Sequence, residues 1–130
     1  MRTVLLLVCL LAILPIPTGG QIGAYNTLSG WYYCTDELSC LHEQAHYLDY
    51  HNGGISGTQA FREAAVVYIL THDQYSLIGY SMSEMYAWIY ADCGGDVPDL
   101  LKPFYPSPPV FRALTLPKGT LYYGIHIPGH

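Results

Sequence analysis

The chain has 130 residues, of which 51% are hydrophobic, and a net charge of −5 at pH 7. This length is enough for one domain with a core of moderate size, so we expect neither a second domain nor a linker. The acidic charge and the lack of a basic cluster in the sequence argue against nucleic acid and anionic membrane surfaces as partners.

The first twenty residues have the pattern of a secretory signal peptide. Arg2 precedes an uncharged apolar run at residues 4–16. This run is shorter than the about 20 residues of a membrane-spanning helix, which disfavours the alternative of an uncleaved anchor. We therefore predict a signal peptide at 1–20, a single mature domain at 21–130, and secretion to an extracellular or periplasmic compartment.

Residues 21–33 combine aromatic and β-branched side chains with turn-forming residues. They predict two short strands, of which the second, at 31–34, leads into a helix capped by Thr35 or Asp36. Such a strand can hold an extended substrate by edge pairing. The alternative is that its aromatic residues only fill a small core.

Three cysteines follow the expected cleavage site: Cys34, Cys40 and Cys93. In an oxidising compartment two of them are expected to form a disulfide and one to remain free, and the sequence leaves the pairing open. A bond from Cys34 to Cys40 would fasten the start of the next helix. A bond from Cys93 to either would tie that helix to a later one.

Residues 38–52 are predicted to be helical and contain the motif His-Glu-x-x-His, with His42, Glu43 and His46. Two histidines four positions apart lie on one helical face and can bind a single zinc ion. The glutamate between them can reach a zinc-bound water, which is the geometry of a hydrolase. Without a third ligand, the alternative is a surface helix that carries two histidines.

Asp49 lies one helical turn after His46. At that place its carboxylate can accept a proton from a ligand imidazole and so support the site. The alternative is an exposed acid on the rim of the helix. A third histidine ligand would be expected at position 52, which is Asn52, so the three-histidine class of zinc site is disfavoured.

Two more helices are predicted, at residues 58–71 and 81–92. Glu84 lies in the first turn of the later one, on a face with two alanines that permit a close helix contact. We predict that Glu84 is the third zinc ligand, which leaves the fourth position to water. The alternative is an acid that only favours the helix N-terminus electrostatically.

The C-terminal part, from residue 92 onward, is rich in proline and is predicted to wrap around the domain in an extended form. Residues 121–127 are predicted to form one strand near the end of the chain. His126 and His130 are expected to be solvated tail residues, since isolated histidines of this kind rarely bind a metal.

The motif from His42 to Asp49, together with Glu84 and Ala87, resembles the small gluzincins related to the catalytic domain of anthrax lethal factor. The Pro-Pro endopeptidases belong to the same group. The likeness runs from about residue 29 to residue 105. It implies an α+β fold, a small zincin-like (minigluzincin) domain that is mainly helical with a short N-terminal β-sheet.

The same resemblance assigns roles to individual residues. It implies that the two histidines and Glu84 hold Zn²⁺, that Glu43 is the general base, and that a tyrosine upstream of Glu84 stabilises the oxyanion. Tyr80 is the nearest such tyrosine and Tyr75 is the alternative. Many relatives have a glutamate where this chain has Trp88, so their substrate preference does not carry over.

These expectations together predict a secreted, monomeric zinc endopeptidase that acts on a peptide or protein and has no membrane contact after signal cleavage. One alternative is a secreted module that binds zinc or a peptide without catalysis. Another is a metal-free structural protein tied by its disulfide. Metal content and cleavage of a peptide library, with and without chelator, distinguish the three.

Overall fold

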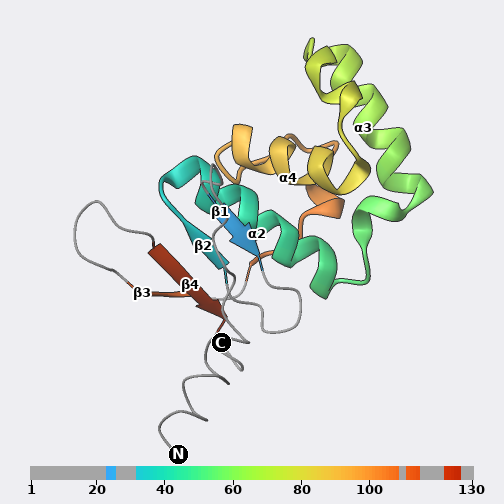
Figure 1. Cartoon of the computed structure of the whole chain (residues 1–130). Helices are drawn as coiled ribbons and strands as arrows, with labels where there is room; N and C mark the ends of the chain where they lie inside the picture. Colours follow the sequence, from blue (N-terminus) through green and yellow to red (C-terminus); the bar gives the residue numbers. More distant parts are fainter. Residues whose placement is uncertain (1–22, 26–31, 109–110, 115–121, 127–130) are drawn as a thin grey trace, which may run out of the picture.

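The computed structural model describes residues 23–25, 32–108, 111–114 and 122–126 (Figure 1). The predicted signal peptide and His130 lie outside these ranges. Residue 126 is described only as part of a strand, so the prediction for the His126 side chain also falls outside. None of the helices within them has the length and apolar character that crossing a bilayer requires.

Helix α2 (Glu37–His51) is the helix predicted to carry the motif. Its N-cap is Asp36, whose carboxylate accepts a hydrogen bond from the backbone N–H of Ser39, while the Ser39 hydroxyl accepts one from the backbone N–H of Asp36. This reciprocal pair satisfies two backbone donors that a helix start otherwise leaves free. Gly53 follows the helix with a φ of 85°, a backbone conformation that residues other than glycine rarely adopt.

The two later helices are confirmed to within one residue at each end. Helix α3 (Gln59–Thr71) is capped by the Thr58 hydroxyl, and helix α4 (Met82–Asp92) by the Ser81 hydroxyl, which accepts from the backbone N–H of Glu84. Three short 3-10 helices connect or follow them: η1 (Ile55–Gly57), η2 (Tyr75–Gly79) and η3 (Lys102–Phe104).

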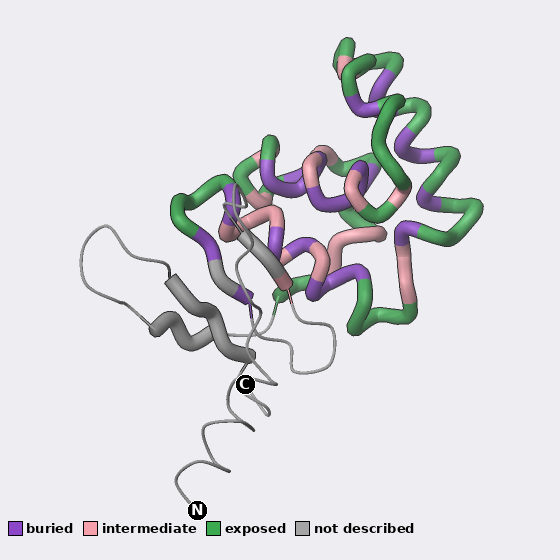
Figure 2. Tube along the Cα trace, in the orientation of Figure 1, coloured by how far each residue is buried: buried purple, intermediate pink, exposed green. Residues whose placement is uncertain are grey.

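The core lies where α2 packs against α4, and Figure 2 shows buried positions recurring along both helices. The segment after α4 packs back on that helix. The Tyr105 ring stacks on Tyr86 with ring centres 4.2 Å apart, and its hydroxyl donates to the Tyr86 carbonyl at 2.9 Å. The Tyr86 hydroxyl in turn donates to the carbonyl of Phe104. These contacts fasten the segment after α4 to the helix that carries Glu84.

Tyr90 and Gln44 tie the two helices together beside the motif. The Tyr90 hydroxyl donates to Oε1 of Gln44 at 2.8 Å. Ala45, the next residue, is fully buried and allows α4 to approach closely. Gln44 and Ala45 occupy the two variable positions of His-Glu-x-x-His, so the motif is fastened to α4 by residues inside it.

Four short strands form an antiparallel sheet in the order β1-β2-β4-β3. They are β1 (Gly23–Tyr25), β2 (Tyr32–Cys34), β3 (Phe111–Leu114) and β4 (Tyr122–His126). Strand β2 pairs with β1 on one side and with β4 on the other, with Tyr33 opposite Tyr123.

The predicted fold class, a mainly helical α+β minigluzincin domain with a short N-terminal β-sheet, is wrong. Residues 35–108 are helical and contain no strand, and the N-terminal strands do not form a sheet of their own. Half of the sheet comes from residues 111–114 and 122–126, of which we predicted the first as part of an extended wrap and the second as one late strand. The physical reason is size: two strands of three residues are too short to be stable alone, so β2 also pairs with β4.

Cys34 and Cys40 form a disulfide, with Cα atoms 5.1 Å apart, and Cys93 is free. This settles the pairing that the sequence left open. The bond joins β2 to the first turn of α2, two residues before His42. A disulfide of this kind fits an extracellular protein.

Candidate metal site

Helix α2 carries His42, Glu43 and His46 on one part of its surface. One ligand atom from each lies within 4.8 Å of the others, so the three can hold a metal ion. The imidazole rings of His42 and His46 are 4.7 Å apart and nearly perpendicular. The helical spacing alone therefore brings two nitrogen donors together, as predicted from the motif.

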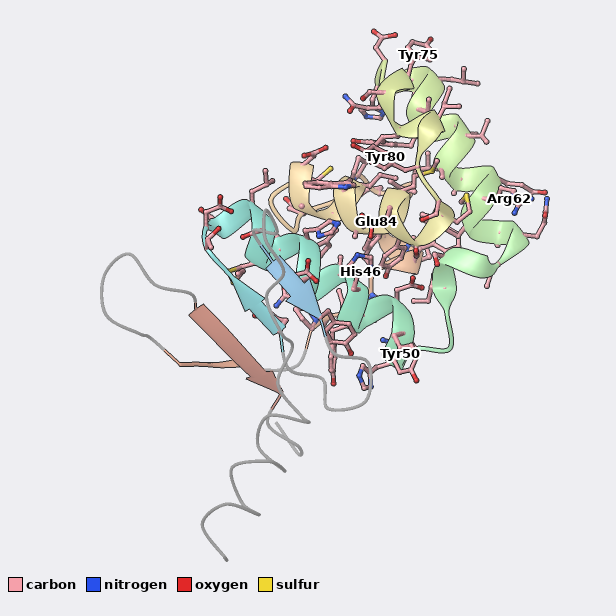
Figure 3. All side chains as sticks on the ribbon, viewed as in Figure 1. His46, Tyr50, Arg62, Tyr75, Tyr80 and Glu84 are labelled. Carbon is pink, nitrogen blue, oxygen red and sulfur yellow. A yellow bond between two sulfur atoms is a disulfide. The ribbon has the colours of Figure 1, made fainter. Side chains whose placement is uncertain are left out.

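Glu84, in the first turn of α4, reaches both imidazoles. Its Oε2 lies 3.0 Å from Nε2 of His42, and its Oε1 lies 2.9 Å from Nε2 of His46. Figure 3 shows Glu84 and His46 close to each other between the two helices. The structure thus brings together the three residues predicted as ligands, although Glu84 is distant from the motif in the sequence.

The distances from each imidazole to Glu84 can be compared with those in a metal site, although the two histidines contact different oxygens of the carboxylate. Two atoms bound at about 2.1 Å to a tetrahedral ion lie about 3.4 Å from each other. The observed separations of 2.9 and 3.0 Å are a few tenths of an ångström shorter. The Glu84 side chain is 39% exposed and can move outward by that amount. Two imidazole nitrogens and one carboxylate oxygen also match the donor set of catalytic zinc sites.

Glu43 contacts the other nitrogen of the same ring. Its Oε1 lies 3.1 Å from Nδ1 of His42, and the residue is only 6% exposed. Glu43 can therefore be counted as a third donor in place of Glu84. We favour Glu84, because both Nε2 atoms face its carboxylate, whereas Glu43 approaches His42 from the Nδ1 side of the ring.

The protonation of His42 reflects these neighbours. Burial lowers the pKa of His42, but its contacts with Glu43 and Glu84 together outweigh burial and place the pKa above its usual range. The site without metal thus favours a protonated His42. A metal ion that binds Nε2 must displace that proton.

Trp88 is part of the site and was not predicted to be. Its ring lies 4.2 Å from the ring of His42, at an angle of 34°. Trp88 follows Glu84 by four residues on α4, so both side chains lie on the face that meets α2. That spacing is the signal in the sequence that would have found it.

Asp49 has a different role from the one predicted. It is 6% exposed, and its carboxylate accepts hydrogen bonds from the backbone N–H of Ser56 at 2.8 Å and from the Ser56 hydroxyl at 2.7 Å. In the part of the chain that the structure describes, these are its hydrogen bonds, and no ligand imidazole is among its partners. Asp49 therefore holds η1 against α2, and it is not an exposed rim acid either.

The two candidate oxyanion tyrosines differ in position. Tyr80 follows η2 and precedes α4, and it is 48% exposed. Its hydroxyl makes no hydrogen bond to any other described residue. Figure 3 shows Tyr75 at the far tip of the helical body, well separated from His46. The assignment of Tyr80 as the oxyanion tyrosine stays a prediction.

Comparisons of the chain with protein-family models, with curated proteins and with solved structures found no match. The functional conclusion below therefore depends on the geometry and chemistry of this site and on the motif that forms it.

Proposed function

We propose that this chain is a zinc endopeptidase of the gluzincin type, with His42, His46 and Glu84 as ligands and Glu43 as general base. The observation that supports it best is the approach of two imidazole Nε2 atoms to one carboxylate, at 3.0 and 2.9 Å. Three protein ligands leave one position for water, as in catalytic zinc sites, whereas structural zinc sites usually have four protein ligands.

Zinc bound by these residues would bring the pKa of a bound water close to neutrality and polarise the scissile carbonyl. Glu43 would take the proton of that water and pass it to the leaving amine. Its Oε1 contacts Nδ1 of His42, so Glu43 would have to turn from that nitrogen toward the water before it could act as the base. Tyr80 is the proposed donor to the oxyanion, for which its exposed side chain would turn toward the site.

The substrate class and the location belong to the same proposal. We propose a peptide or protein substrate, a monomeric enzyme, and secretion directed by residues 1–20. The disulfide between Cys34 and Cys40 supports an oxidising compartment. The likeness of the motif to the small gluzincins supports the type of chemistry, and it carries no substrate preference.

Glu43→Gln tests the proposal directly, because the amide keeps the shape of the side chain but cannot act as a base. We expect zinc near one equivalent in both forms, cleavage of a peptide library by the wild type, and no cleavage by Glu43→Gln. A chelator should abolish wild-type cleavage and added zinc should restore it. Glu63→Gln is the matched control, since Glu63 is an exposed acid on α3 that contacts Gln59. Equal cleavage by Glu43→Gln and wild type would refute the proposal.

A second candidate is a secreted metal-binding module without catalysis. The contact between Glu43 and Nδ1 of His42 favours it, because a carboxylate at that nitrogen orients a ligand imidazole. Zinc binding without cleavage of any library peptide would select this function.

A further inference from the structure

The ring of His42 has a neighbour at each of its two nitrogens, and two other rings pack against it. Glu84 faces Nε2 and Glu43 faces Nδ1. The ring of His46 is nearly perpendicular to it, and the ring of Trp88 packs on it at a centre-to-centre distance of 4.2 Å and a tilt of 34°. The indole therefore limits rotation of the imidazole.

Glu43 has two tasks that compete in the proposed reaction. In most metal sites, the second nitrogen of a ligand histidine donates to a separate carboxylate or carbonyl that holds the ring. Here the group at Nδ1 is Glu43, which is also the proposed base. When Glu43 turns toward a water, His42 loses that hydrogen bond and needs another support.

Trp88 is placed to give that support. It lies on the same face of α4 as Glu84, and its neighbours Ala87 and Ile89 are both fully buried, so the backbone that carries it is fixed. By contrast, the side chain of Glu84 is 39% exposed. An indole that packs against an imidazole also excludes water from one side of the ring, which strengthens the electrostatic contacts on the other sides.

We propose that Trp88 is a positioning residue that holds the imidazole of His42 by ring packing, so that Glu43 is free to act as the base. This inference rests on the proposed metal site but does not require peptidase activity.

Zinc and cobalt affinities of the full chain test the inference. Trp88→Leu should lower zinc affinity about tenfold, as loss of groups that support a ligand does elsewhere, and should change the visible absorption of the cobalt-loaded protein. Trp88→Phe, which keeps an aromatic ring, should restore most of the affinity and the wild-type spectrum. Tyr50→Leu is the matched control, because Tyr50 is an exposed aromatic residue at the other end of α2.

A double-mutant cycle gives the sharpest outcome. Glu43→Gln alone should change zinc affinity little, because Trp88 still holds the ring, whereas Glu43→Gln in the Trp88→Leu background should lower it about tenfold further. Additive effects, or a Trp88→Leu protein with wild-type affinity and spectrum, would overturn the role of Trp88 and leave the proposed function intact. A wild type that binds zinc without cleaving peptides would refute the peptidase alone, and one that binds no zinc would refute both.

Circular dichroism and thermal unfolding of the metal-free variants separate positioning from folding. If Trp88→Leu lowers the melting temperature, Trp88→Phe decides the question. A folded Trp88→Phe protein with wild-type affinity supports positioning by the ring, and a folded one with the same loss as Trp88→Leu contradicts it.

Discussion

Nε2 of His46 lies 2.9 Å from Oε1 of Glu84, and the two residues belong to helices that pack directly against each other. A hydrogen bond from Tyr90 to Gln44 joins the same two helices next to it. The contact therefore links the helix packing to the candidate metal site.

Replacing Glu84 should remove most of the metal affinity. Glu84→Gln keeps the size of the side chain but removes the charge, so we expect zinc affinity to fall by more than about 100-fold, beyond the range for groups that only support a ligand. Competition with a chromophoric chelator measures this. Glu63→Gln should bind zinc as the wild type does, and equal affinity of both variants would exclude Glu84 as a ligand.

The pH dependence of the metal-free protein should report on His42. Its pKa is raised in the folded state, so the stabilisation from its charged form is fully present below the unfolded pKa of about 6.5 and is lost as pH rises through the folded pKa. The difference in free energy of unfolding between wild type and His42→Gln should thus shrink with rising pH. Urea unfolding in the presence of chelator, from about pH 5.5 to pH 8.5, measures it.

Zinc affinity should change with pH in the opposite direction. Zinc competes with the proton on His42, so its affinity should rise as pH rises through the same range, and binding should release protons. Calorimetric titration in two buffers of different ionisation enthalpy measures the number released. No proton release near pH 6.5 would contradict a protonated His42 in the metal-free site.

The pair formed by Asp49 and Ser56 should matter for stability and little for metal binding. Ser56→Ala removes one hydrogen bond from a buried carboxylate, so we expect a loss of about 2 kcal/mol in the free energy of unfolding and nearly unchanged zinc affinity. Ser76→Ala, at an exposed serine of η2, is the control. If Asp49→Asn instead lowers zinc affinity while stability holds, Asp49 supports the metal as the sequence first indicated.

The disulfide should stabilise the folded chain moderately. Cys34 and Cys40 are six positions apart, and a loop of this size predicts a loss of about 2 kcal/mol when both are replaced by serine. Urea unfolding of the double variant tests this. Cys93→Ser is the control, because it removes the free thiol next to the Tyr68 hydroxyl and leaves the disulfide intact. Its free energy of unfolding shows what a Cys→Ser change does outside the disulfide.

The helices could be predicted closely because their ends are determined by nearby residues. Thr58 and Ser81 cap α3 and α4 from the position before the first turn, and Gly53 follows α2 with positive φ. The donors of the candidate site were also predictable: spacing on one helix gave His42 and His46, and the place of Glu84 on the face of a later predicted helix gave the third, which the resemblance supported.

The sheet and the support of the site could not be predicted in this way, since both depend on contacts between distant residues. Strand β2 pairs with β4, about 90 residues later in the sequence, and nothing near Tyr33 indicates Tyr123 as its partner. Asp49 bonds to Ser56 across the turn at the end of α2, where helical spacing pointed to His46 instead. In both cases the chain turns back on itself between the two partners, and the spacing of apolar residues within one helix or strand does not predict such a turn.

The bond between Cys34 and Cys40 has a practical consequence for any attempt to load this protein with metal. Dithiothreitol, which is often added during purification, would reduce the disulfide at Cys40, two residues before His42. It would also bind zinc itself. Material made in a reducing cytoplasm would lack that bond from the start. Preparations that appear metal-free should therefore be repeated after oxidative refolding, without thiols, before the site is judged empty.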